Sequence, residues 1–395
     1  MVDQGQGAGP LAGIRVLELG QLLAGPWAGT QLAYFGADVI KVEAPSGDPI
    51  RGWRQVDEGG TSYWWRSLAR NKRCITLNLR DPRGQTLARS LAEQSDVLIE
   101  NFRPGTLERW GLGPDVLHAL HPGLVIVRVS GFGQTGPYRD RPGYASIAEA
   151  MGGLRHLTGE PDAPPVRPNL SLGDTLAGMQ AAMGVLLALR ERDRSGRGQV
   201  IDVALTEAVF GMLEAVVPER AGAGVTRAPS GTTITGVAPS NLYRCQDGHV
   251  VIGANGESLF RRFVTAIGRP DLAEDPRMAS NAARVSHSVE LDRAIEDWTK
   301  ARTVLAVVDA LVAAEVPCGP VYDAQAMRSD PHFEARGWFE QVDGFELPAI
   351  GPRLSRTPGQ TRHAGPALGT DTDAVLASLG CASAEVEALR RDGVI

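Results

Sequence analysis

Short apolar runs alternate with helical patterns through the first third of the chain, and this alternation constrains the fold more than any other feature. The strand-like runs occupy residues 13–19, 37–43, 73–79, 96–102 and 123–133. Helical spacing lies between them, as at residues 28–36 and 85–94. Such alternation predicts an α/β fold in which a parallel sheet carries helices on both faces. Ligands of these folds bind at the carboxyl ends of the strands.

The pattern changes after residue 174. A long apolar helix is predicted at residues 175–193, with Gly178 and Gly184 as points of close packing. Residues 218–240 are rich in Gly, Pro, Ser and Thr, which is typical of a linker or a mobile loop. A hairpin pattern around Asp247 and two further helical patterns follow. We therefore expect a second, smaller α+β domain in this section.

The composition excludes several classes of protein. Hydrophobic residues make up 43% and charged residues 22%, as in folded globular proteins, and the formal charge of −6 argues against a nucleic-acid-binding protein. The four cysteines form no CxxC pair and have no histidine at ligand spacing, which predicts reduced, buried thiols and no metal site. The N-terminus carries no signal-peptide or transmembrane pattern, so a cytoplasmic protein without membrane association is expected.

Residues 131–136 match G-x-G-x-x-G after a predicted strand, but their context differs from that of the dinucleotide-binding fingerprint. That fingerprint requires a helix to begin within the glycines, so that the pyrophosphate lies on the helix N-terminus. Here Pro137 and the sequence YRDRPG follow, without helical spacing. The motif therefore does not indicate nicotinamide binding.

Basic residues gather near several predicted strand ends. They are Arg51, Arg54, Arg70, Lys72, Arg73, Arg80, Arg103 and Arg109. Taken singly, each is typical of an ordinary solvated surface. Trp53, Phe102 and Trp110 lie close to them in the sequence, however, and guanidinium groups beside aromatic rings suit a phosphate-bearing nucleotide. An anionic ligand of medium size is the second interpretation.

Asp174 is the remaining candidate for chemistry, because the sequence has no G-x-S-x-G elbow and no lysine in a Schiff-base setting. An aspartate that opens a helix is most often an N-cap, whose carboxylate accepts the free N–H groups. The same N–H groups also favour a developing oxyanion, so a carboxylate nucleophile that attacks a thioester is the alternative. Gly173 would then leave room for the acyl group.

Taken together, eight stretches of the sequence resemble the family III CoA-transferases, which include formyl-CoA, carnitine and succinyl-CoA:dicarboxylate CoA-transferases. They are LAGIRVLELGQLLAGP, FGADVIKVEAPSGD, NKRCITLNL, DVLIENFRPG, SGFGQTGPY, LGDTLAG, SGRGQVIDVAL and VPCGPV, in that order. The resemblance covers nearly the whole chain. It implies an α/β fold with a Rossmann-type large domain, a smaller α+β domain and an interlocked homodimer.

The resemblance also implies domain boundaries and site residues. The boundaries are a large CoA-binding domain at residues 1–200 and 335–395, a linker at 201–225, a small domain at 226–318 and a return linker at 319–334. Asp174 would be the catalytic nucleophile, which forms an acyl anhydride and then an aspartyl-CoA thioester. The CoA contacts would be Gln21, Leu22, Ala24, Leu77, Arg80, Asn101, Phe102, Arg103, Arg109, Trp110 and Tyr144. Coenzyme A is then a substrate, and no tightly bound cofactor or metal is expected.

The departures from the family pattern bear on the substrate. Gln21 stands where formyl-CoA transferase has histidine, Ala44 where it has arginine, and its glycine-rich lid is matched only loosely by residues 231–236. These differences disfavour formate and oxalate, and favour succinyl-CoA with a dicarboxylic acid such as glutarate.

Two alternative functions stay open. One is α-methylacyl-CoA racemase, although Tyr144 and Ala145 stand where that enzyme carries its His-Asp pair, and tyrosine is a poor base at neutral pH. The other is a non-catalytic acyl-CoA-binding protein.

Overall fold

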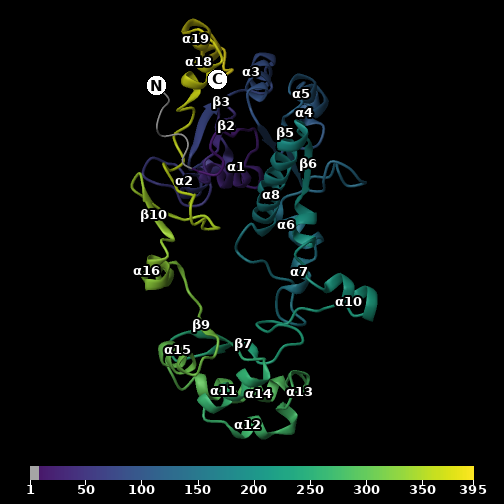
Figure 1. Ribbon diagram of the computed structural model, residues 1–395, viewed down its shortest axis with the longest axis vertical. Coiled ribbons are helices and arrows are strands. Elements are labelled where there is room, and N and C mark those ends of the chain that lie inside the picture. The colour runs from purple at the N-terminus through teal and green to yellow at the C-terminus, as the bar shows by residue number, and fades with distance from the viewer. Residues whose placement is uncertain (1–8) are drawn as a thin grey trace. The chain divides into compact units, whose positions relative to one another are not determined.

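The computed structural model describes residues 9–395 (Figure 1). The chain divides into two compact units. The first unit comprises the described residues up to Leu154, Pro168–Glu214 and His332–Ile395, and the second comprises Arg155–Arg167 and Ala215–Pro331. Both ends of the chain therefore contribute to the first unit.

A six-stranded sheet forms the centre of the first unit. Its strands are β1 (Arg15–Glu18), β2 (Asp38–Glu43), β3 (Lys72–Thr76), β4 (Val97–Glu100), β5 (Val125–Ser130) and β6 (Val200–Ala204). The order is β3-β2-β1-β4-β5-β6, and all neighbouring strands are parallel. The predicted α/β fold with a parallel sheet is confirmed. The strand order reverses between β1 and β4, which makes this junction the topological switch point of a Rossmann-type sheet.

Helices cover both faces of this sheet (Figure 1). The covering helices are α1 (Ala24–Tyr34) and α8 (Leu172–Ser195) on one face, and α3 (Pro82–Glu93), α5 (Pro114–Leu120), α18 (Thr372–Ser378) and α19 (Ser383–Arg391) on the other. Successive strand residues supply the two cores, since Val16 and Val39 pack under α1 whereas Leu17 and Ile40 pack on the opposite face. Strands buried on both faces explain the continuous apolar runs in the sequence.

Shorter elements complete the first unit. They are η1 (Pro49–Gly52), α2 (Tyr63–Leu68), α4 (Thr106–Arg109), α6 (Ala145–Met151), α9 (Leu205–Phe210), β10 (Phe339–Val342) and β11 (Phe345–Pro348). The C-terminal segment closes the open edge of β3, where Asp371 Oδ2 accepts from Cys74 N–H at 2.8 Å and Thr372 Oγ1 accepts from Thr76 N–H at 3.0 Å. This segment thereby protects an edge strand from pairing with other chains.

Helix α8 is a core helix of the first unit. A Cβ on Gly178 would lie 2.7 Å from the Ala24 carbonyl oxygen, and one on Gly184 would lie 2.9 Å from Ile201. The predicted close packing at both glycines is confirmed. Among residues 9–395, α8 alone is long and apolar enough to cross a membrane, but Ala177, Ala181 and Val185 on this helix are buried in the core.

The second unit is the smaller α+β domain that the sequence predicts. Its antiparallel sheet contains β7 (Ser240–Arg244), β8 (His249–Gly253) and β9 (Cys318–Pro320). Its helices are α10 (Val216–Ala223), α11 (Glu257–Ala266), α12 (Asp271–Glu274), η2 (Pro276–Met278), α13 (Asn281–Ser286), α14 (Ser288–Thr299), α15 (Val304–Ala313) and α16 (Ala324–Ser329). Two short helices, α7 (Leu154–Leu157) and α17 (Pro331–Ala335), lie where the chain passes between units.

The observed boundaries differ from the predicted ones. Residues 201–225, expected as a linker, contain most of the edge strand β6 together with α9 and α10. The chain enters the second unit at Ala215 and leaves it at Pro331, and residues 155–167 also belong to that unit. The Gly- and Pro-rich composition of residues 218–240 marks the section after this boundary rather than the boundary itself.

Candidate active site

Two loops meet at the switch point, one after β1 and one after β4. The Gln21 N–H donates to Asn101 Oδ1 at 2.7 Å, and Asn101 Nδ2 donates to the Gln21 carbonyl oxygen at 2.7 Å. A Cβ on Gly20 would lie 3.0 Å from Asn101 Oδ1, so the glycine permits this close approach. The structure thus brings together two of the predicted CoA-binding positions, at the edge where such folds bind nucleotides.

The loop after β1 has an unusual backbone conformation. Leu22 has a φ of 61°, which lies in the left-handed region that residues other than glycine rarely adopt. Its N–H donates to both carboxylate oxygens of Asp48, at 3.2 and 3.1 Å. Ala24 begins α1 and is only 3% exposed, so it can contact a ligand only through its main chain.

Asp174 lies in the first turn of α8 rather than at its cap. The helix begins at Leu172 and its N-cap residue is Ser171, so the expectation that Asp174 is the N-cap is wrong. The residue is half-buried, not fully buried. It remains within the turn where the helix dipole favours an anion or a developing oxyanion.

Gly173 has a different role from the one expected. A Cβ at this position would lie 3.2 Å from both Cα and the carbonyl oxygen of Ala145. Helix α6 therefore occupies the space that was assigned to an acyl group, and the glycine serves helix packing. The fully buried Glu149 of α6 accepts the Gly173 N–H at 3.4 Å, so a second carboxylate lies at the start of α8.

The first turn of α8 lies toward the switch point. Gly178, one helical turn after Asp174, packs on the Ala24 carbonyl at the start of α1, while Met183 and Leu186 line a groove with Leu32 further along α1. The two helices therefore run in the same direction, and Asp174 is at the end that faces the β1 loop. Tyr144, the N-cap residue of α6, is 71% exposed beside this turn.

The remaining predicted CoA contacts lie on the segments that follow β3 and β4, including the short helix α4, along the same edge of the sheet. The rings of Phe102 and Trp110 pack edge to face with centroids 5.0 Å apart. Arg80, after β3, and Arg103 and Arg109, after β4, are exposed. Leu77 is 1% exposed, so only its main chain is accessible.

Two members of the predicted basic cluster are buried rather than exposed to solvent. Arg70 and Lys72 are each 1% exposed, so the expectation of solvated side chains is wrong for both. Lys72 Nζ lies 2.8 Å from Glu18 Oε2, and Arg70 donates to the Pro348 carbonyl oxygen at 2.6 Å. These two side chains hold the protein together and cannot reach a phosphate.

A buried network of charges below the β1 loop was missed in the sequence. It comprises Glu18, Lys41, Glu43, Asp48 and Lys72, each 3% exposed or less. Burial lowers the pKa of Lys41, but the carboxylates of Asp48, Glu18 and Glu43 outweigh it and hold that pKa above its usual range. Burial, aided by the charge of Lys41, lowers the pKa of Lys72. Glu18 and Lys41 inside apolar strand runs were the available signal.

A second buried pair lies at the end of β4. Arg128 Nε donates to Glu100 Oε1 at 2.9 Å, and Phe102 N–H donates to Glu100 Oε2 at 2.7 Å. Burial raises the pKa of Glu100 to about 7, although the bonds from Arg128 and Phe102 favour the carboxylate. Glu100 therefore has a pKa near neutral pH and bonds directly to the main chain of the loop that carries Asn101.

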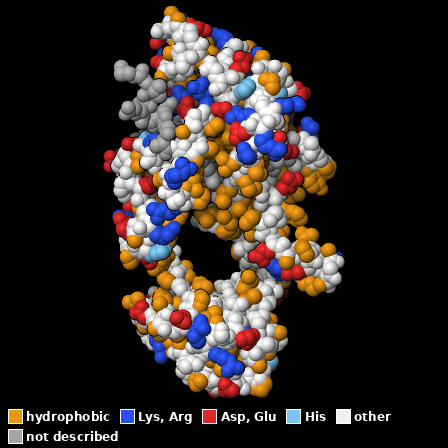
Figure 2. Space-filling view, in the orientation of Figure 1, with side chains coloured by type: hydrophobic (Ala, Val, Ile, Leu, Met, Phe, Trp, Pro, Cys, Tyr) orange, Lys and Arg blue, Asp and Glu red, His pale blue; other side chains and the backbone are white. Residues whose placement is uncertain are grey.

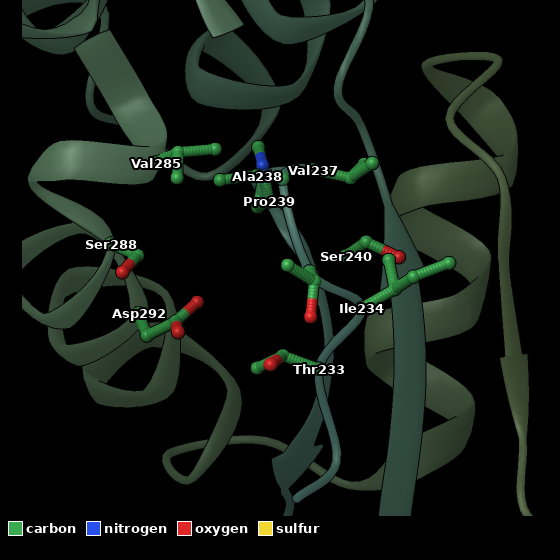
Figure 3. Close-up of a pocket in the computed structure, with 11 residues that line it drawn as sticks. Thr233, Ile234, Val237, Ala238, Pro239, Ser240, Val285, Ser288 and Asp292 are labelled. Atoms are coloured by element: carbon green, nitrogen blue, oxygen red, sulfur yellow. The ribbon is translucent and has the colours of Figure 1, made fainter. Parts of the chain in front are cut away.

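The segment that loosely matches the family lid, residues 231–236, lies in the second unit. Residues 233–236 of this segment line a pocket of about 190 Å³, in which Thr233 lies across from Asp292 of α14 (Figure 3). Asp292 accepts from Tyr243 Oη at 2.6 Å and from Asn241 Nδ2 at 3.1 Å. Among residues 9–395, no group of three or more His, Cys, Asp or Glu side chains is arranged to hold a metal ion.

The fold and the switch-point loops define a class of protein, namely a Rossmann-type α/β domain that binds nucleotide-bearing ligands at the carboxyl ends of its strands. Residues 11–372 match the model of the family described as CoA-transferase family III, and the chain belongs to that family. It is therefore an enzyme, a CoA-transferase, and it uses an acyl-CoA as a substrate.

Individual relatives agree with this assignment. Succinyl-CoA–D-citramalate CoA-transferase of Chloroflexus aurantiacus is 50% identical over 370 residues, which is 91% of each chain. The β subunit of succinyl-CoA–L-malate CoA-transferase from the same organism is 41% identical over 98% of each chain. The crystal structure of a CAIB/BAIF family protein from Brucella suis matches with a TM-score of 0.87 and 34% identity, covering 94% of this chain and 100% of that chain.

Proposed function

We propose that this enzyme transfers coenzyme A from succinyl-CoA, or a similar acyl-CoA, to a dicarboxylic acid, with Asp174 as the nucleophile. The observation that carries the proposal is the position of Asp174 in the first turn of α8, at the end of the helix that faces the switch-point loop. Relatives that use succinyl-CoA and a dicarboxylic acid support the choice of substrates.

The first half of the reaction acylates the enzyme and then loads it with coenzyme A. A carboxylate oxygen of Asp174 attacks the thioester carbon, the C–O bond forms, the C–S bond breaks, and CoA thiolate leaves a mixed anhydride. The thiolate then attacks the Asp174 carbonyl carbon of this anhydride. An aspartyl-CoA thioester forms and the donor carboxylate is released. N–H groups of the first turn of α8 would stabilise the oxyanions.

The second half of the reaction repeats these steps in reverse order with the acceptor. A carboxylate of the acceptor attacks the aspartyl thioester, which gives a second mixed anhydride and CoA thiolate. The thiolate attacks the acyl carbon of the acceptor, so the new acyl-CoA leaves and the Asp174 carboxylate is regenerated. No proton donor or redox partner is needed, because every attacking and leaving group is an anion.

Coenzyme A would lie along the carboxyl edge of the sheet. The proposed contacts are Gln21, Leu22, Ala24, Leu77, Arg80, Asn101, Phe102, Arg103, Arg109, Trp110 and Tyr144. Exposed guanidinium groups at residues 80, 103 and 109 suit the phosphates, because arginine pairs with phosphate through several donors. The main-chain groups of Ala24 and Leu77 would contact the ligand where their side chains cannot.

We also propose that the enzyme is a cytoplasmic homodimer, with the interlocked form that its family implies. An exposed apolar face of α8 supports the proposal of a permanent dimer. Met179, Met183, Leu186 and Leu187 on α8 are 49% to 64% exposed, and Figure 2 shows hydrophobic side chains gathered over the region of α8. Exposed apolar surfaces of this kind mark interfaces. Light scattering together with sedimentation would measure the mass in solution.

A panel of donors and acceptors tests the proposal. Succinyl-CoA would be incubated in turn with malate, citramalate, glutarate, formate and oxalate, and the new acyl-CoA would be measured by mass spectrometry. We expect transfer to the dicarboxylic hydroxy acids and glutarate. Incubation with succinyl-CoA alone should leave a hydroxylamine-sensitive adduct on Asp174. Epimerisation of a 2-methylacyl-CoA without exchange would instead identify a racemase.

A further inference from the structure

The loop between β1 and α1, residues 19–23, is held from below by buried charged side chains. Lys41 Nζ donates to the Gly20 carbonyl oxygen, and Asp48 accepts the Leu22 N–H. Just beyond the loop, Lys72 Nζ donates to the Pro26 carbonyl oxygen at 2.7 Å. Three charged groups from β2, β3 and the connection between them therefore contact the main chain at the start of α1.

These groups also neutralise one another. Lys41 Nζ lies 3.1 Å from Asp48 Oδ2 and 3.5 Å from Glu18 Oε1, while Lys72 Nζ lies 2.8 Å from Glu18 Oε2. A Cβ on Gly29 would lie 1.9 Å from Glu18 Oε2, so α1 has a glycine where the carboxylate lies against it. Helix α1 therefore packs directly against the buried charged network, with no room for a side chain at Gly29.

Stability alone does not account for this arrangement. Burying an ion pair costs desolvation, and well-packed apolar residues at the same positions often stabilise a protein at least as well. The network instead fixes one particular backbone conformation. Leu22 has a φ of 61°, which is unfavourable for leucine, and Asp48 accepts its N–H through both carboxylate oxygens.

We propose that Asp48 and Lys41 are positioning residues, which hold the β1–α1 loop in its strained form so that Gln21 and Leu22 are presented to the acyl-CoA. The inference rests on the proposed function, in which this loop contacts coenzyme A. Asn101 fixes the same loop from the β4 side, through both main-chain groups of Gln21. The loop is thus fixed from both neighbouring strands before any ligand binds.

The test compares Asp48→Asn, in the connection after β2, with Asp38→Asn, which makes the same chemical change at the first residue of β2. Asp38 pairs with Arg73 at 2.6 Å, and both side chains are partly exposed. We expect D48N to lower kcat/KM for succinyl-CoA by about 100-fold, since a displacement of about 1 Å near the reacting groups has effects of this size. D38N should change kcat/KM less than about twofold, because it removes a partly exposed pair.

A rescue experiment separates positioning from folding. In the D48N background, Leu22→Gly should restore activity several-fold because glycine adopts a positive φ without strain, whereas Leu22→Ala should not. A purely structural role would give the two double variants equal activity. Should D48N not fold, Asp48→Glu keeps the charge but shifts the carboxylate, and the same glycine and alanine pair is compared in that background.

Two results would overturn the inference. One is a folded D48N that loses no more activity than D38N, and the other is equal activity of the glycine and alanine double variants. Failure of the proposed function would look different. In that case wild-type enzyme would exchange CoA without an adduct on Asp174, while the contrast between D48N and D38N would still report on the loop.

Discussion

The two ends of the central sheet differ in how deeply their charged side chains are buried. At the amino ends of the strands, Asp38 pairs with Arg73 and Asp96 with Arg192, and these side chains are 18% to 29% exposed. At the carboxyl ends, Glu18, Lys41 and Glu100 are at most 1% exposed. Lys72, which begins β3 and is buried against Glu18, is the exception at the amino ends. The other pairs named there are partly exposed, whereas the charges toward the carboxyl ends are buried.

The partners of these charges explain the difference. The carboxyl-end charges bond to loop main chain, as Lys41 does to Gly20 and Glu100 does to the Phe102 N–H. The amino-end pairs join mainly side chain to side chain. Buried charges are costly, and hydrogen bonds to a charged group are stronger than neutral ones. We infer that the cost is incurred where loops must be rigid, which is the edge where we propose that the substrate binds.

The largest expected effect is on catalysis. Asp174→Ala should lower kcat by at least about 1,000-fold, which is the scale for removing a nucleophile that acts in a catalytic unit. Asp193→Ala, an exposed position in the last turns of the same helix, is the matched control and should retain activity. The measurement is CoA exchange followed by mass spectrometry, with the affinity for CoA measured by calorimetry. Exchange at the wild-type rate in the Asp174 variant would require another nucleophile.

The next effect is on stability. Gly29→Ala would place a Cβ 1.9 Å from Glu18 Oε2 and force a buried carboxylate from its lysine partners. We expect the free energy of unfolding to fall by about 3 kcal/mol, as for other variants that disturb a buried charge. Gly52→Ala is the control, because a Cβ at that position would have no atom within 4 Å beyond its chain neighbours. Urea denaturation of both variants measures the difference. Equal stability would show that the Glu18 carboxylate can move away from the added Cβ without loss of its lysine partners.

The sequence predicted the parallel sheet well, because strands buried on both faces give apolar runs that are easy to recognise. The order of the strands could not be predicted from those runs alone, since pairing is a long-range property. Arg70 and Lys72 were misassigned for a related reason. A run such as RNKR resembles a solvated surface unless the fold places its acidic partners, which are as distant in sequence as Glu18 and Glu340.

The candidate site was predicted less completely than the fold. Asp174 was a candidate from its place at the start of a predicted helix, whereas Gln21 and Asn101 were named through family resemblance. The structure adds the hydrogen bonds between Gln21 and Asn101. Gly173 was assigned to substrate space because the contact of α6 with α8 cannot be seen in one sequence. Glu149 was overlooked, since a glutamate within an amphipathic helix gives no sign that it is fully buried.

A smaller effect concerns pH. Burial raises the pKa of Glu100 from 4.5 to about 7, so between these values the folded protein binds a proton that the unfolded chain releases. The contribution of Glu100 to the free energy of unfolding is therefore fully present below about pH 4.5. It is lost as the pH rises through 7, and the total loss is up to about 3 kcal/mol. Arg128 and Glu108 are the charged groups that contribute to this equilibrium.

Glu100→Gln tests this dependence, because glutamine is neutral at every pH. The unfolding free energy of the variant should fall less steeply from pH 5 to pH 8 than that of the wild type. Chemical denaturation at several pH values provides the measurement. Parallel curves for the two proteins would mean that Glu100 stays ionised beside Arg128 throughout this pH range.

The smallest effect belongs to the amino edge itself. Asp96→Asn removes a pair with Arg192, whose Nη1 lies 2.8 Å from Asp96 Oδ1, while Asp96 Oδ2 also accepts the Arg15 N–H. Partly exposed pairs contribute little, so we expect a loss of at most about 1 kcal/mol in unfolding free energy and an unchanged KM for acyl-CoA. A large rise in KM would show that a charge at the amino edge also positions the substrate loops. The contrast between the two ends of the sheet would then reflect burial alone and not function.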